Sequence, residues 1–288
     1  MSDLIGIIGG SGLYEMEGFK VKEERKVETP FGLPSDKIVI GELSGREVAF
    51  LPRHGRGHKF SPSNINYRAN ICALKMVGVK WIISLSAVGS LRKDIKPGEL
   101  VMVDQFIDKT YLRKNTFFDD GVVVHIMYGH PICEHISGML YDSAKKLKIK
   151  AHKGGTYVCM EGPQFSTRAE SFLHREWGAD LIGMTNATEA KLAREAEICF
   201  ATVALSTDYD CWKEDDHVDV AAILATVKQN IENAKSLIKE AVSRFPAEDG
   251  CTCHRALEGA IMTDLSVVSD ETRMRLEPIA GKYLSKGE

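Results

Sequence analysis

The chain has 288 residues, of which 44% are hydrophobic and 27% are charged, as in ordinary globular proteins. Its formal net charge of −3 argues against nucleic acid or an anionic membrane as the main partner. Without an apolar run of ~18 residues or a signal-peptide pattern at the N-terminus, the sequence predicts a cytoplasmic protein.

Segments with strand and helix patterns alternate along the chain. Strands are expected where runs are apolar and rich in β-branched residues: 4–10, 36–43, 46–52, 80–88, 99–107, 155–162, 179–184 and 198–205. Helices are expected where apolar residues follow the 3.6-residue period or a capping signal: 61–79, 136–149, 167–178, 186–197 and 220–238. This alternation predicts a single α/β domain, residues 1–288, with a mixed central β-sheet flanked by helices.

Local signals refine three of the expected helix starts. Ser61 is expected to cap the first helix, with Pro62 in its first turn. Thr167 to Glu170 has the spacing of a capping box, and Asn186 with Glu189 is interpreted as a second pair of this kind.

The chain has seven cysteines. Four lie in apolar settings and are expected to pack as small hydrophobic residues: Cys72, Cys133, Cys159 and Cys199. The segment "CTCH" at 251–254 is compatible with a metal site or a strained disulfide. A lone C-x-C supplies too few ligands for structural zinc, so these thiols are expected to be reduced and structural.

Two segments have residues that suit an anion. "GIIGGSGL" at 6–13 is a glycine turn where the backbone could approach phosphate and Ser11 could donate a hydroxyl. It does not match the dinucleotide fingerprint, and a plain tight turn is the alternative. "LPRHGRGH" at 51–58 contains Arg53 and His54, and a guanidinium fork suits phosphate. A solvated turn is the alternative, and a zinc site is disfavoured by the adjacent cations.

Three further segments place polar or aromatic residues where strands end or helices begin. Ser86 lies among small residues in "SAVGSL", which is otherwise a glycine turn. Phe165 and Ser166 precede a helix start, where Phe165 could stack on a flat ring or act as a hydrophobic staple. Met184 and Thr185 precede another helix start, where backbone N–H groups attract anions.

The buried strand at 198–205 leads into two acids, Asp208 and Asp210, in "ALSTDYDCW". If strand geometry persists, residues two apart face the same side. Two carboxylates there could bind metal, act as an acid–base pair, or accept hydrogen bonds from a ligand. An anion site together with acceptors for a base indicates a nucleoside that reacts with phosphate.

The chain resembles the trimeric purine nucleoside phosphorylases, and within them the branch that cleaves 5'-methylthioadenosine. The resemblance spans residues 5–212 and rests on motifs in family order: "GIIGGSGL", "TPFGLPSD", "RHGRGH", "NYRANI", "SAVGSL", "EGPQFSTRAE", "GMTNATEAKLAREAEI" and "TDYDCW". It implies phosphorolysis of 5'-methylthioadenosine to adenine and 5-methylthioribose 1-phosphate in a homotrimer. Phosphate is then a co-substrate, and no cofactor or metal is implied.

The resemblance also implies residue roles. Phosphate would be held by Ser11, Arg53, His54, Ser86 and Thr185. The base would contact Phe165, Ser166, Asp208 and Asp210, and the ribose would contact Met184. The 5' group would lie against Val220, Ile223, Leu224 and His125 of a neighbouring subunit.

Asp208 and Asp210 are expected to have different chemical roles. A protonated Asp208 could supply the proton that the departing purine takes up at N7. An ionised Asp210 can only accept, which favours a 6-amino over a 6-oxo purine. An apolar 5' pocket would gain roughly 0.8 kcal/mol per buried CH2-sized group, although these helix residues could instead only pack the core.

Four other functions remain as alternatives. A phosphorylase of 6-oxopurine nucleosides such as inosine, guanosine or methylthioinosine is disfavoured by the acid pair. A hydrolytic nucleosidase would leave Arg53 and His54 without an anion. A non-catalytic nucleoside binder and a dinucleotide oxidoreductase fit the combined motifs less well.

Overall fold

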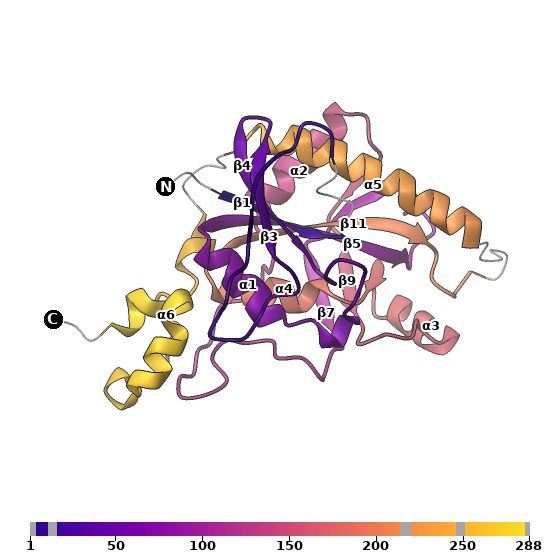
Figure 1. Cartoon of the computed structure of the whole chain (residues 1–288). Helices are drawn as coiled ribbons and strands as arrows, with labels where there is room; N and C mark the ends of the chain where they lie inside the picture. The colour runs from indigo at the N-terminus through magenta and orange to yellow at the C-terminus, as the bar shows by residue number, and fades with distance from the viewer. Residues whose placement is uncertain (1–3, 11–15, 214–219, 246–250, 286–288) are drawn as a thin grey trace.

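A computed structural model describes residues 4–10, 16–213, 220–245 and 251–285 (Figure 1). Its strands are β1 Leu4–Gly9, β2 Lys20–Arg25, β3 Ile38–Leu43, β4 Arg46–Pro52, β5 Val79–Ser90, β6 Leu100–Met102, β7 Gln105–Asp108, β8 Ala151–Lys153, β9 Thr156–Cys159, β10 Leu181–Gly183 and β11 Cys199–Asp208. Its α-helices are α1 Tyr67–Met76, α2 Glu134–Lys146, α3 Arg168–Glu176, α4 Asn186–Glu195, α5 Val220–Val242 and α6 Asp270–Leu284. Short 3-10 helices are η2 Pro62–Asn64, η3 Thr252–Arg255 and η4 Leu265–Val267.

The strands of the described residues form one eleven-stranded mixed sheet, which confirms the predicted fold class. The order β2-β3-β4-β1-β5-β10-β9-β7 forms the main path, and β11, β6 and β8 branch from β5. β5 is central because it pairs in parallel with β1 and β11 and antiparallel with β10. Its sequence "WIISLSAV" is almost wholly apolar, as a strand covered on both faces requires.

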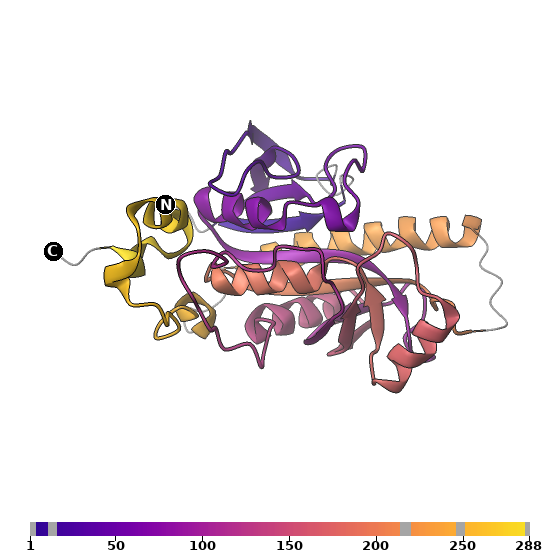
Figure 2. The ribbon, with the colours of Figure 1, turned by 90° about the horizontal axis from the view of Figure 1, so that it is seen from below.

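Helices cover both faces of the sheet. α2 and α5 pack together on one side and α1 and α4 on the other, as the upper and lower layers of Figure 1 show. Turned by 90°, the molecule has its C-terminal segment at one end and α3 at the other (Figure 2). No helix among the described residues is long and apolar enough to cross a membrane.

Two predicted elements were wrong in their bounds. The first helix begins at Tyr67 rather than Ser61, because Asn66 supplies the capping oxygen to Ala69 N and Ser61 makes no cap bond. Pro62 instead opens the 3-10 turn η2. The expected strand at 99–107 is two strands, because β6 pairs with β11 and β8 whereas β7 pairs with β9.

Candidate functional site

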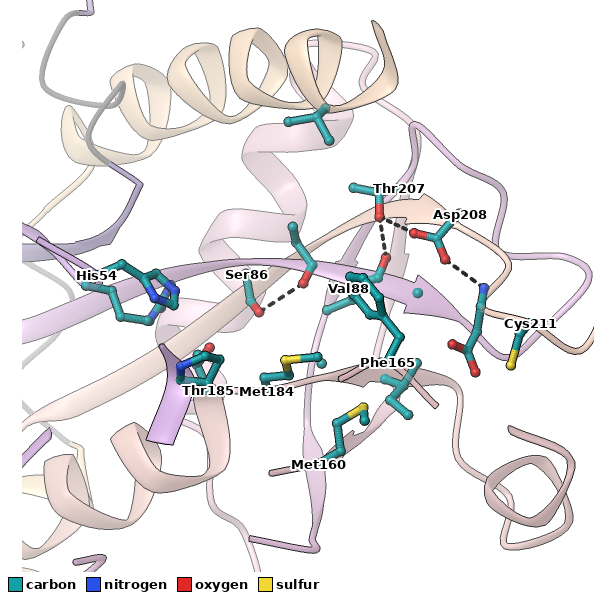
Figure 3. Close-up of a pocket in the computed structure, with 18 of the residues that line it drawn as sticks. His54, Ser86, Val88, Met160, Phe165, Met184, Thr185, Thr207, Asp208 and Cys211 are labelled. Atoms are coloured by element: carbon teal, nitrogen blue, oxygen red, sulfur yellow. Dashed lines mark hydrogen bonds between the residues drawn. The ribbon is translucent and has the colours of Figure 1, made fainter. Parts of the chain in front are cut away.

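A cavity of ≈ 610 Å³ opens where β4, β5, β10 and β11 end (Figure 3). Eight of the predicted site residues line it: Arg53, His54, Ser86, Phe165, Met184, Thr185, Asp208 and Asp210. They come from segments up to 157 residues apart, so the fold brings together what the sequence holds separate. This convergence at strand ends is what an α/β architecture favours.

Arg53, directly after β4, is 4% exposed and belongs to a buried hydrogen-bond network. Its Nε and Nη2 donate to the two carboxylate oxygens of Glu189 at 2.5 and 3.0 Å. Nη1 donates to Leu85 O and Nη2 also donates to Ser84 Oγ. A guanidinium has five N–H donors, so four are used within the protein and one on Nη1 remains for a ligand.

The sequence-based role of Glu189 was wrong. Glu189 is 1% exposed and neutralises Arg53, while Thr185 occupies the N-cap of α4 without a side-chain cap bond. Asn186, which was expected to cap, donates through Nδ2 to Ser84 Oγ and to Glu189 Oε2. A carboxylate left unpaired beside a buried guanidinium would be costly, so Glu189 pairs with Arg53 instead of turning back to cap the helix.

His54 contributes a neutral ring to the cavity. Its Nδ1 lies 2.8 Å from Phe60 O, and since a carbonyl only accepts, Nδ1 carries the proton. Burial and the neighbouring charge of Arg53 lower the pKa of His54 to about 4. His58 stacks on it with ring centroids 4.2 Å apart. His54 therefore presents a lone pair at Nε2 rather than a positive charge.

Tyr157 on β9 supports the same end of the cavity and was missed by sequence reasoning. Its hydroxyl lies 3.1 Å from Ser86 Oγ and accepts from Thr185 N at 3.4 Å. Burial raises the pKa of Tyr157 to about 12, so the phenol stays neutral. A side chain at Gly183 would collide with this hydroxyl, which explains why only glycine fits there.

A second buried ion pair positions the backbone of Met184. Arg113 donates through Nη1 to Met184 O and through Nε to Glu161 Oε1 at 3.1 Å. Glu161 also accepts from Tyr111 N and Ser63 Oγ. Arg113 lies in none of the quoted motifs, and Glu161, which opens "EGPQFSTRAE", was given no role. Arg113 lies 71 positions from Met184, so nothing near either residue signals the contact.

Asp208 ends β11 at the opposite side of the cavity. Burial, reinforced by the nearby Asp210 carboxylate, raises the pKa of Asp208 above its usual value. Thr207 Oγ1 lies 2.6 Å from Asp208 Oδ2 and 3.1 Å from Val88 O. The hydroxyl has one proton, so a protonated Asp208 Oδ2 can donate to Thr207 Oγ1 while that hydroxyl donates to Val88 O.

Asp210 reaches the cavity differently from the prediction. The strand ends at Asp208, and Asp210 adopts a left-handed conformation with φ 52°. Its N–H donates to Asp208 Oδ1 at 2.7 Å, and its own Oδ2 is buried without a hydrogen-bond partner among the described residues. Gly89 leaves room for the pair, since a Cβ there would lie 3.1 Å from Asp208 Oδ1. Asp210 lines the cavity and keeps one acceptor atom, Oδ2, without a partner among the described residues.

Phe165 and Ser166 lie at the mouth of this end. Phe165 lines the cavity and is 85% exposed, so its ring is open to solvent on its outer side. Ser166 does not line the cavity; its Oγ faces Met160 Sδ at 3.9 Å and its carbonyl accepts from Cys211 Sγ. Met160, Cys211 and Ile182 line the cavity and were missed.

The remaining predicted residues either fall outside the described part of the structure or do not line the cavity. Ser11 falls outside the described residues, as do the side chains of Val220, Ile223 and Leu224, whose backbone begins α5. Val227, one turn further along α5, lines the cavity. His125 is exposed, donates its N–H to Ala260 O, and does not line the cavity of its own chain.

The chain matches the phosphorylase superfamily over residues 4–243. It is 55% identical to the S-methyl-5'-thioadenosine phosphorylase of Geobacter sulfurreducens, over 99% of this chain and 100% of that protein. It is 52% identical to the protein of the same name from Hyperthermus butylicus, over 90% and 95%.

Solved structures give the same picture. The fold matches a methylthioadenosine phosphorylase sourced from an Antarctic soil metagenomic library with a TM-score of 0.93 and 48% identity, covering 96% of this chain and 99% of that one. A mutant adenosine/methylthioadenosine phosphorylase from Schistosoma mansoni, in complex with methylthioadenosine, matches with a TM-score of 0.81 and 38% identity, over 86% and 93%.

Proposed function

The chain belongs to the phosphorylase superfamily, and we propose that it cleaves 5'-methylthioadenosine with phosphate to adenine and 5-methylthioribose 1-phosphate. One observation carries the proposal: a single cavity has Arg53 and Thr185 at one end and an acid pair, Asp208 and Asp210, at the other. Relatives about half identical over nearly the whole chain, named for this reaction, support the substrate. We further propose that residues 1–288 act as one phosphorylase domain.

Phosphate would be bound between Arg53, Ser86 and Thr185, with Ser11 completing the set. The remaining Nη1–H of Arg53 would donate to one phosphate oxygen, and the N-terminus of α4 at Thr185 favours negative charge. Because Glu189 neutralises Arg53, the protein offers directed donors rather than a large net charge. The lone pair of His54 Nε2 would accept from a protonated phosphate oxygen.

The chemical step follows from this placement. As the N9–C1' bond breaks, its electron pair moves to the purine, and Asp208 donates its proton to N7. The sugar becomes oxocarbenium-like, and a phosphate oxygen bonds C1' from the face opposite the base. Asp208 is left as a carboxylate, and no metal or organic cofactor takes part in these steps. Met184 would bind the ribose through its backbone, and Phe165 would contact the base.

Asp210 would select adenine. Its unpaired Oδ2 accepts from the 6-amino group, whereas a 6-oxo group would place acceptor against acceptor. We therefore expect Asp210→Asn to shift the kcat/KM ratio of methylthioadenosine to methylthioinosine by about 100-fold toward the 6-oxo substrate. Initial rates on both nucleosides check this, with the substitution Asp142→Asn, at an exposed position of α2, as the matched control. An unchanged ratio would show that Asp210 does not read position 6.

We also propose that the chain forms a homotrimer in which His125 reaches the 5' pocket of its neighbour. Between β7 and α2 the chain exposes three large apolar side chains that a subunit interface would bury: Tyr111 (78%), Leu112 (69%) and Met127 (86%). Light scattering is expected to give three times the mass of the 31.9 kDa chain. His125→Ala should raise KM for methylthioadenosine severalfold and leave KM for phosphate unchanged. A single-chain mass at all concentrations would contradict this assembly.

A further inference from the structure

Four cysteines far apart in the sequence meet at one point of the fold. Cys133 is the N-cap of α2, Cys199 begins β11, and Cys251 and Cys253 flank the start of η3. Their sulfur atoms all lie within 4.8 Å of one another. Three of the four residues are buried, and Cys251 is half-buried. The cluster lies apart from the catalytic cavity, whose lining includes none of them.

The distances between the sulfur atoms distinguish a disulfide bond from a shared metal ion. The Sγ atoms of Cys133 and Cys251 are 3.5 Å apart, far beyond the about 2.05 Å of a disulfide bond. A tetrahedral zinc ion with Zn–S distances of about 2.3 Å places its sulfur ligands about 3.8 Å apart. The measured 3.5 Å and the upper limit of 4.8 Å for the other sulfur pairs bracket the spacing that a single tetrahedral ion requires.

The surroundings suit a closed structural site. Four sulfur ligands leave no position for water, as in structural rather than catalytic zinc sites. His254 approaches from outside the cluster, with Nε2 3.5 Å from Cys199 Sγ and Nδ1 3.1 Å from Glu197 O. Such outer contacts orient the ligands of metal sites. Cys133 also lies at a helix N-terminus, where the helix dipole stabilises a thiolate.

We propose that Cys133, Cys199, Cys251 and Cys253 bind one structural Zn²⁺. The ion joins the C-terminal segment, residues 251–285, to α2 and to the start of β11. Cys199 is 66 positions after Cys133 and Cys251 is a further 52 positions along, so the ion closes two long loops at once. The segment "CTCH" alone predicted no zinc site, because the two missing ligands are distant in sequence and are supplied only by the fold.

Metal content and intact mass test the proposal directly. The full chain is produced with added zinc and without a metal-binding tag, then purified under reducing conditions without chelator. We expect about one zinc per chain by elemental analysis, and native mass spectrometry should show the added ion. A strong chelator should lower the melting temperature by about 5 °C or more, and added zinc should restore it.

Variants separate zinc from its alternatives. Cys251→Ser with Cys253→Ser should lose the zinc, whereas Cys211→Ser, an exposed cysteine outside the cluster, should keep it. Cys251→His should retain zinc, since three cysteines and one histidine are also a zinc ligand set, but cannot form a disulfide there.

Three outcomes would overturn the proposal. They are a wild-type chain without metal, a mass lacking four hydrogens and so indicating two disulfides, or zinc that survives the double substitution. If the double variant does not fold, the metal content of the wild type and of Cys251→His still decides.

Discussion

Asp208→Asn is expected to lower kcat for methylthioadenosine about 10²- to 10⁴-fold, because the variant has no proton to give to the departing purine. The substitution keeps the local hydrogen bonds. The amide oxygen can accept from Asp210 N in place of Oδ1, and the amide nitrogen can donate to Thr207 Oγ1 in place of a protonated Oδ2. The loss should therefore be chemical rather than structural, and binding of adenine should change little.

The pH dependence identifies the group responsible. The pKa of Asp208 is raised by burial, and the acid acts only while protonated, so activity should fall as pH rises through that raised pKa. The variant should lose this alkaline limb because Asn does not titrate. Steady-state rates across pH test both points, with exposed Asp142→Asn as the control. A variant that keeps the wild-type rate and still loses activity as the pH rises would exclude Asp208 as the acid.

Arg53→Met is expected to have the largest effect on stability, because it leaves Glu189 buried and unpaired. Breaking a buried pair on one side costs about 3–5 kcal/mol of unfolding free energy. Replacing both partners, Arg53→Met with Glu189→Met, should recover most of that loss, since apolar groups of similar volume replace buried ion pairs well. Denaturant unfolding of the two variants measures the difference.

The same double variant isolates the role of Arg53 in catalysis. It should remain folded yet lose about 10²- to 10³-fold in kcat/KM for phosphate, since the Nη1–H donor is gone. Initial rates against phosphate concentration check this. A stable double variant with wild-type phosphate kinetics would mean that the Arg53–Glu189 pair is structural only.

The predictable part of the fold is local. β3 and β4 fall on the expected strands 36–43 and 46–52 and pair as a hairpin, and Thr167 with Glu170 forms the expected capping box, because both depend on neighbours within a few residues. The residues at the strand ends were found for the same reason, since a buried strand that stops on a polar side chain is visible in the sequence.

The missed part depends on contacts across the fold. Glu189 pairs with Arg53 across 136 positions, and nothing near either residue signals the other. Tyr157 has an ordinary strand environment in sequence, yet its hydroxyl joins Ser86 to Thr185. Asp210 lines the cavity, as the sequence predicted, but not by continuing the strand. The chain leaves the strand and Asp210 adopts a left-handed conformation.

The central claim is that one cavity joins phosphate to the sugar of an adenine nucleoside. The most direct measurement is base release from methylthioadenosine, adenosine and inosine, each with and without phosphate. The account predicts adenine release that requires phosphate and is fastest from methylthioadenosine. Faster cleavage of inosine, or release that does not need phosphate, would contradict it.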